Sequence, residues 1–85
     1  MLLKGRPAAA RIEKFGIALQ GSLDGANTIF TTPDVFDPDT LRVYYNGVRI
    51  YAGATNDFTV TGASQLTTLF TPKAGDRLAA DYVIG

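Results

Sequence analysis

Apolar and polar residues alternate in short runs along most of this chain, a pattern typical of β-strands with one buried face. The clearest example is LRVYYNGVRIY at residues 41–51, where two runs of β-forming residues flank Asn46-Gly47. Asn-Gly between two such runs is typical of a β-hairpin with a two-residue turn. This turn predicts four cross-strand pairs: Tyr45 with Val48, Tyr44 with Arg49, Val43 with Ile50, and Arg42 with Tyr51.

The predicted register gives the hairpin two different faces. The residues expected to point to the core are Val43, Tyr45, Val48 and Ile50. The opposite face carries rings and guanidinium groups that can stack across the strands, from Arg42, Tyr44, Arg49 and Tyr51. Protein interfaces favour Tyr and Arg, so this second face is a candidate binding surface. The alternative is an ordinary solvated sheet face.

Turn-forming residues recur at short intervals and leave no room for a long helix. Examples are Asp24-Gly25, Asn46-Gly47 and the PKAG run at residues 72–75. Segments rich in Thr, Val, Ile, Phe and Tyr lie between the turns, at residues 27–32, 41–46, 48–52, 57–61, 65–71 and 77–84. These six predicted strands indicate an all-β fold, a small antiparallel β-sandwich or barrel.

Residues 1–20 are predicted to form an extended basic N-terminal arm and a first strand, ahead of a single β domain over residues 21–85. Phe15, Ile17 and Leu19 alternate with other residues, which favours a strand over 14–20 rather than a short helix over 8–15. Four basic residues and one acidic residue give the first 20 positions a net charge of 4 − 1 = +3. The apolar MLL start indicates a segment that orders against a neighbouring molecule, with a solvated tail as the alternative.

The chain has 85 residues, enough for one domain with a thin core. Folding buries about 63% of the surface of a chain of this size. Such small domains often depend on disulfides, metals or partners, and this sequence has no cysteine and no histidine. Partner proteins are therefore the expected source of added stability. No apolar run approaches the roughly 20 residues of a membrane span and no signal core follows the N-terminus, so a soluble, unprocessed chain without membrane contact is expected.

Candidate catalytic groups are sparse in this sequence. Without His or Cys, an acid–base pair must come from Asp, Glu, Lys or Tyr, and the serines have no partner base, so neither a catalytic residue nor a cofactor is predicted. Asp34, Asp37 and Asp39 could offer oxygen ligands to calcium, but turn formation beside prolines explains them more simply, so no metal site is predicted. Nucleic-acid binding is not favoured, because the basic arm precedes an acidic body and no recognition helix is evident.

Four sequence motifs follow one another over residues 23–83: LDGANTIFTTP, LRVYYNGVRIY, DFTVTG and TPKAGDRLAADYV. Their order resembles a small β module of tailed-bacteriophage structural proteins, where "DG.N..FT" precedes "L.VY.NG.R", "DYTV.G" and "P..GD.L..DY". The chain departs from this pattern at Phe58, where the module often has Tyr, and at Ala54 to Asn56, which lengthen a loop. The resemblance implies a non-enzymatic virion component that contacts other virion proteins in many copies.

The resemblance therefore implies a protein of the virion, assembled in the host cytoplasm. Because partners are the expected source of added stability, it is expected to act as a capsid cement or decoration protein. Its expected partners are major capsid or neck and tail subunits, together with further copies of itself in a homo-oligomer. The predicted interface residues are Lys4, Arg6, Arg11, Lys14, Arg42, Tyr44, Arg49 and Tyr51. The alternatives are a neck or tail component, such as a head-tail connector or fibre-attachment piece, and a module that binds carbohydrate or the host surface.

Overall fold

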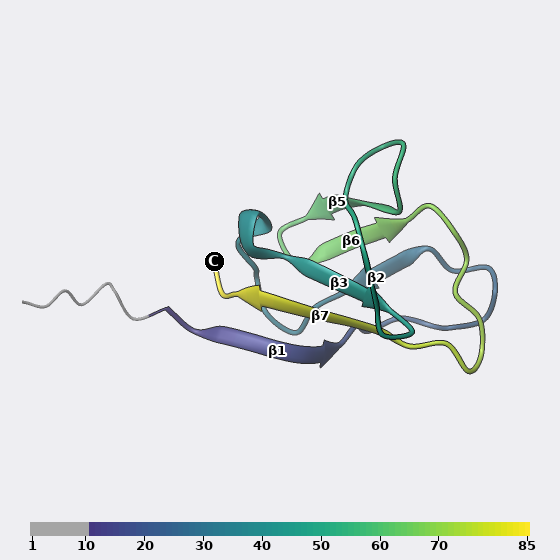
Figure 1. Ribbon diagram of the computed structural model, residues 1–85, viewed down its shortest axis with the longest axis horizontal. Helices are drawn as coiled ribbons and strands as arrows, with labels where there is room; N and C mark the ends of the chain where they lie inside the picture. The colour runs from purple at the N-terminus through teal and green to yellow at the C-terminus, as the bar shows by residue number, and fades with distance from the viewer. Residues whose placement is uncertain (1–10) are drawn as a thin grey trace, which may run out of the picture.

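The computed structural model describes residues 11–85, which form two antiparallel β-sheets packed against each other (Figure 1). The strands are β1 (Glu13–Ala18), β2 (Ile29–Thr31), β3 (Arg42–Tyr45), β4 (Val48–Ile50), β5 (Phe58–Gly62), β6 (Gln65–Thr68) and β7 (Leu78–Val83). The first sheet has the order β1-β7-β3-β4 and the second has the order β2-β6-β5. The fold is therefore a small all-β sandwich, as the sequence predicts.

Each predicted strand segment overlaps one observed strand, although β1 begins one residue before the segment predicted over 14–20 and β5 ends one residue after the segment predicted over 57–61. A helix over 8–15 is excluded at its C-terminal end, because Glu13–Phe15 belong to β1. The rest of the predicted arm, residues 1–10, lies outside the described residues. The structure adds one element that the pattern did not predict, a 3-10 helix η2 (Pro38–Thr40), which begins after the cap residue Asp37.

The β3–β4 hairpin has the predicted turn and register. Asn46 and Gly47 have φ angles of 52° and 85°, which fit the two central positions of a type I′ turn. Tyr44 lies opposite Arg49, and the neighbouring pairs agree as well. The predicted pair of Arg42 with Tyr51 is not formed, because β4 ends at Ile50. On the other side of β3, Arg42 lies opposite Asp81 of β7.

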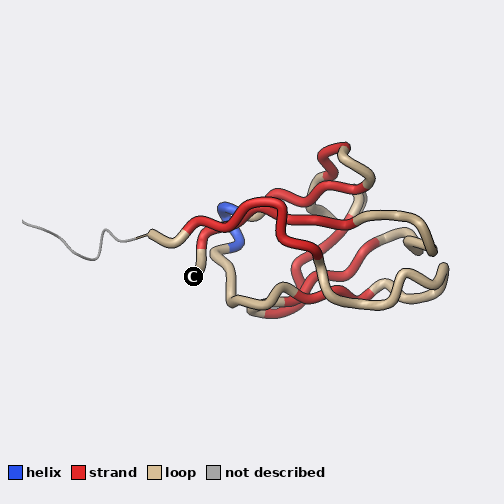
Figure 2. Tube along the Cα trace, turned by 90° about the horizontal axis from the view of Figure 1, so that it is seen from below, coloured by secondary structure: helices blue, strands red, loops and turns tan. Residues whose placement is uncertain are grey.

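The core lies between the two sheets (Figure 2). Strand β7 contributes every second residue to it: Leu78, Ala80 and Tyr82 are buried. The other buried apolar residues are Phe30, Phe36, Val43, Phe58 and Leu66. Of the predicted core residues of the hairpin, Val43 is buried, and Tyr45 and Ile50 pack at the margin of this cluster.

The prediction that Val48 points into the core is wrong. Its side chain is 67% exposed. Val48 begins β4, which is the last strand of its sheet, and it directly follows the exposed turn at Gly47. A residue on the inward side of this edge strand therefore still meets solvent at its turn end.

Single bridges connect the two sheets at both edges. Beyond β1, the N–H of Gln20 donates to the Thr31 carbonyl of β2 at 2.8 Å, and the Thr31 N–H donates back at 2.9 Å. At the other edge Ala52, after β4, forms a bridge with Phe58 of β5. These contacts close part of each sheet edge, so the sandwich resembles a flattened barrel.

Candidate docking surface

The predicted Arg and Tyr residues of the hairpin lie on the face of the four-stranded sheet turned away from the second sheet, here called the outer face. Directly opposed residues of antiparallel strands share a face. Tyr44 lies opposite both Arg49 and Ala79, and Arg42 lies opposite Asp81. Because their neighbours Val43 and Ala80 are buried between the sheets, these side chains point outward.

Arg49 stacks on Tyr51 along one strand, and this is a correction to the predicted cross-strand stacking. The guanidinium carbon of Arg49 lies 5.1 Å from the centre of the Tyr51 ring. Residues two apart on an extended chain share a face, and Tyr51 lies past the end of β4 with no opposing strand residue. Tyr51 remains 57% exposed, so its ring is available to a partner.

Arg11 and Arg42 come together at one end of the outer face. They line a shallow hollow of about 260 Å³ with Glu13, Asp39 and Asp81. Two guanidinium groups and three carboxylates around one hollow give it nearly balanced charge. Such a mixture suits a polar protein contact better than a phosphate backbone, which would meet the carboxylates.

Phe15 adds an exposed ring to this surface, and the sequence analysis missed it. Phe15 and Gly16 of β1 together stand opposite Asp81, between the regular pairs of Lys14 with Tyr82 and Ile17 with Ala80. This β-bulge leaves Phe15 67% exposed beside the hollow. A glycine inside a strand pattern is the signal that could have revealed the bulge.

Asp81 fixes the bulge from the neighbouring strand. Its Oδ1 accepts a hydrogen bond from the Gly16 N–H at 2.7 Å. Gly16 has a φ of 62°, in the left-handed region that glycine adopts most easily. A second hollow of about 390 Å³ lies over Gly16 and Ala79, beside Tyr44. The small residues at these two positions leave the sheet surface open there.

The remaining predicted interface residues do not join this surface. Lys14 lies opposite Tyr82, whose side chain points inward, and Lys14 is half-buried on that same side of the sheet. Lys4 and Arg6 lie outside the described residues. Of the eight predicted residues, the structure therefore places five on or beside the outer face: Arg11, Arg42, Tyr44, Arg49 and Tyr51.

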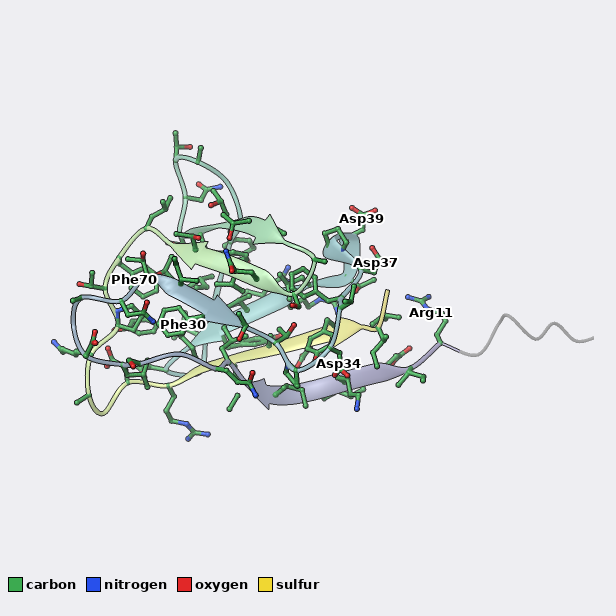
Figure 3. All side chains as sticks on the ribbon, turned by 180° about the vertical axis from the view of Figure 1, so that it is seen from behind. Arg11, Phe30, Asp34, Asp37, Asp39 and Phe70 are labelled. Atoms are coloured by element: carbon green, nitrogen blue, oxygen red, sulfur yellow. The ribbon has the colours of Figure 1, made fainter. Side chains whose placement is uncertain are left out.

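The aspartates of the 34–39 loop have separate roles, and Figure 3 shows Asp34 apart from Asp37 and Asp39. Asp37 accepts from the Asp39 N–H at 3.0 Å and caps η2. Asp34 accepts from the Tyr82 hydroxyl at 2.8 Å. Burial, together with this hydrogen bond, raises the pKa of Tyr82 to about 12. Within residues 11–85, no group of three or more His, Cys, Asp or Glu side chains is placed to hold a metal ion.

A loop at residues 73–77, here called the 73–77 loop, holds the hairpin turn. Asp76 accepts from the Tyr45 hydroxyl at 2.5 Å, from Asn46 Nδ2 at 3.2 Å and from the Lys73 N–H at 3.0 Å. These donors lower the pKa of Asp76, with the Lys73 N–H contributing most. Hydrogen bonding to Asp76 raises the pKa of Tyr45 in turn. Asp76 and Tyr45, whose pKa values are shifted, thus hold the 73–77 loop against the hairpin turn.

No protein family, curated protein or solved structure matches this chain. In the part of the chain that the structure describes, no helix is long and apolar enough to cross a membrane.

Proposed function

We propose that this protein is a non-enzymatic structural subunit of a tailed-phage virion, and that it acts as a capsid cement or decoration protein. The observation that carries the proposal is the gathering of Arg42, Tyr44, Arg49, Tyr51 and Phe15 on the outer face of one sheet. The order of the four sequence motifs supports the assignment to a virion. The perturbed side chains serve structural hydrogen bonds, which supports a role without catalysis.

The outer face has the composition of an interface. Arg and Tyr are enriched where binding energy concentrates, because their large side chains bury much area around a polar handle. The exposed ring of Tyr51 and the exposed ring of Phe15 offer apolar area at two places on this face. Around them, Arg11, Arg42 and Asp81 offer charged groups that fix the register of a partner.

Docking in many copies would also supply stability that the body lacks. Within residues 11–85 the core has eight buried hydrophobic residues, a small number for a domain that must survive in a particle. Binding of a partner to the folded state alone stabilises that state by mass action. A lattice of capsid subunits provides such a partner at a high local concentration.

The N-terminal arm adds a second contact in this proposal. Residues 1–10 carry Lys4 and Arg6 and no acidic residue, whereas residues 11–85 carry six basic and eight acidic residues, a net charge of 6 − 8 = −2. Ten residues reach at most about 35 Å when fully extended, enough to cross onto an adjacent subunit. Arm and sheet face together would give each copy two attachment points, which raises avidity.

Immunogold electron microscopy on intact particles tests the assignment. Antibody label distributed over the head would support a cement or decoration protein. Label confined to the neck or tail would instead support the connector or fibre-attachment alternative. Particles without label would overturn the virion proposal and favour the host-surface module, which glycan-array binding by the isolated protein would then identify.

A further inference from the structure

The tip of the β3–β4 hairpin carries an asparagine, Asn46, whose side-chain amide forms hydrogen bonds through both its nitrogen and its oxygen. The Asn46 Nδ2 donates to Asp76 Oδ1 at 3.2 Å, and the Asn46 Oδ1 accepts from the Arg77 N–H at 2.7 Å. The Asn46 N–H also donates to the Arg77 carbonyl at 2.8 Å. Three hydrogen bonds therefore tie one exposed turn residue to the 73–77 loop.

The residue that follows Asn46 is glycine, and this pair is chemically labile. An amide nitrogen that follows asparagine can attack the side-chain carbonyl carbon, and glycine offers the least steric hindrance to that attack. Nothing lies within 4 Å of the position that a Cβ on Gly47 would take, so the turn is open to water. Asn27 and Asn56 precede threonine and aspartate, so the chain contains only one Asn-Gly pair.

We propose that Asn46 is a deamidation site, and that the 73–77 loop slows its deamidation through contacts with the Asn46 side-chain amide. In the reaction, the Gly47 nitrogen loses its proton to water and attacks Asn46 Cγ. A C–N bond forms, the Cγ–Nδ2 bond breaks, and ammonia leaves with the added proton. Water then opens the cyclic imide at either carbonyl, which gives aspartate or isoaspartate at position 46.

The hydrogen bonds of Asn46 Nδ2 and Oδ1 oppose the first step. Ring closure requires the Asn46 side chain to rotate until its Cγ lies next to the Gly47 nitrogen. A side chain bonded at Nδ2 and at Oδ1 must release both partners before it can turn. The folded state therefore slows a reaction that the Asn-Gly pair favours in an unfolded chain.

Deamidation would also remove the contact that prevents it. A carboxylate at position 46 has no proton to donate to Asp76, and it places a second negative charge beside the first. The 73–77 loop would lose one of its ties to the hairpin, next to Tyr44 and the hollow at Gly16 and Ala79. Slow deamidation of Asn46 would thus alter the shape of the outer face. This consequence does not depend on which partner binds there.

Peptide mass spectrometry of aged protein tests this proposal, with Asn27 and Asn56 as internal references. Asp76→Ala removes the acceptor of Asn46 Nδ2, and we expect about fivefold faster deamidation at position 46 in the folded protein, the factor that corresponds to one net hydrogen bond. The matched control is Asp37→Ala, which removes the carboxylate that caps η2 ahead of β3, whereas Asn46 follows the other end of β3. The control should leave the rate at Asn46 unchanged.

The wild-type protein provides a second measurement that does not depend on a variant's folding. Deamidation at Asn46 should be several-fold slower in buffer than in urea, and in urea Asp76→Ala should match the wild type. Equal rates for folded wild type and folded Asp76→Ala would overturn the proposal, as would an equal acceleration by Asp37→Ala. Equal wild-type rates in buffer and in urea would overturn it as well.

Discussion

The carboxylate of Asp81 and the backbone N–H of Gly16 lie 2.7 Å apart on neighbouring strands, and this contact shapes the outer face. A regular strand at this position would continue the alternation of β1 and would present one residue opposite Asp81. The bulge presents two, Phe15 and Gly16, and turns the ring of Phe15 toward the Arg42 hollow. Asp81 on the inner strand β7 thus helps to determine which side chain the edge strand β1 exposes.

Asp81→Ala should therefore loosen the bulge. The Gly16 N–H loses its acceptor, and a hydrogen bond of this kind contributes about 1 kcal/mol. We expect a lower urea midpoint with an unchanged slope, and weaker particle binding because Phe15 is no longer held. The matched control is Asp39→Ala, a carboxylate that lines the same hollow. Equal losses of stability in both variants would contradict the role given to the Gly16 contact.

The outer face should matter more for docking than for folding. Arg49→Ala combined with Tyr51→Ala removes the stacked pair, whose mutual attraction in the exposed state is worth about 0.5–1 kcal/mol. Binding to particles that lack the protein should fall by tenfold or more, the cost of an interface hot spot.

The matched control for this pair lies on the other sheet. Ile29 and Thr59 flank Thr67 on the outward side of the three-stranded sheet, so Ile29→Ala with Thr59→Ala truncates two side chains on a face other than the outer face. This control should bind particles like the wild type. If the Arg49 and Tyr51 variant loses stability and binding in equal measure, the outer face is an ordinary solvated surface.

Removal of residues 1–10 should reduce particle binding and leave the sandwich folded. This truncation keeps the hydrogen bond from the Ile84 N–H to the Ile12 carbonyl at 2.9 Å and all of β1, which begins at Glu13. Circular dichroism and urea unfolding should match the full chain, and a sedimentation assay with particles should show the loss. Substitution of Lys4 and Arg6 by Ala should reproduce much of that loss if charge carries it.

A longer truncation has a different expected outcome. Removal of residues 1–14 also deletes Ile12, Glu13 and Lys14, which pair with the end of β7. Such a chain should be less stable as well as unable to dock. Full particle binding by the shorter truncation would show that the arm has no role in attachment.

Local patterns predicted the strands and the hairpin because both depend on residues close together in the sequence. Asn46-Gly47 determines a turn, and the turn determines the register of the hairpin. The position of β7 between β1 and β3 could not be predicted. Non-local pairing depends on how the two sheets cover each other, which no short motif contains.

The candidate surface was predictable to a similar degree. The register placed Tyr44 and Arg49 together on one face, and the structure agrees. The bulge at Phe15 went unrecognised because Phe15, Ile17 and Leu19 formally alternate, while the extra residue shifts Phe15 to the outer side. Lys14 ended on the opposite side for the same reason: its orientation depends on pairing with Tyr82, which lies 68 positions later in the chain.

Tyr82 and Asp34 predict a loss of stability in alkaline solution. The Tyr82 hydroxyl is buried and donates to Asp34, so folding raises its pKa from 10.0 to about 12. Between these two values the unfolded chain loses the proton and the folded chain retains it. The contribution is therefore fully present below pH 10.0 and is lost as the pH rises toward about 12. Urea unfolding across this range should show the decline.

Tyr82→Phe isolates this contribution. The variant has no hydroxyl to ionise, so the stability difference between it and the wild type should be largest near neutral pH and should shrink as the pH rises above 10.0. At neutral pH, loss of the hydrogen bond leaves Asp34 without its donor and should cost about 1–2 kcal/mol. Tyr45 also has a raised pKa, through Asp76, but both proteins retain it, so its effect cancels in the difference. A difference that stays constant from neutral pH to about pH 12 would show that Tyr82 does not retain its proton in the folded state.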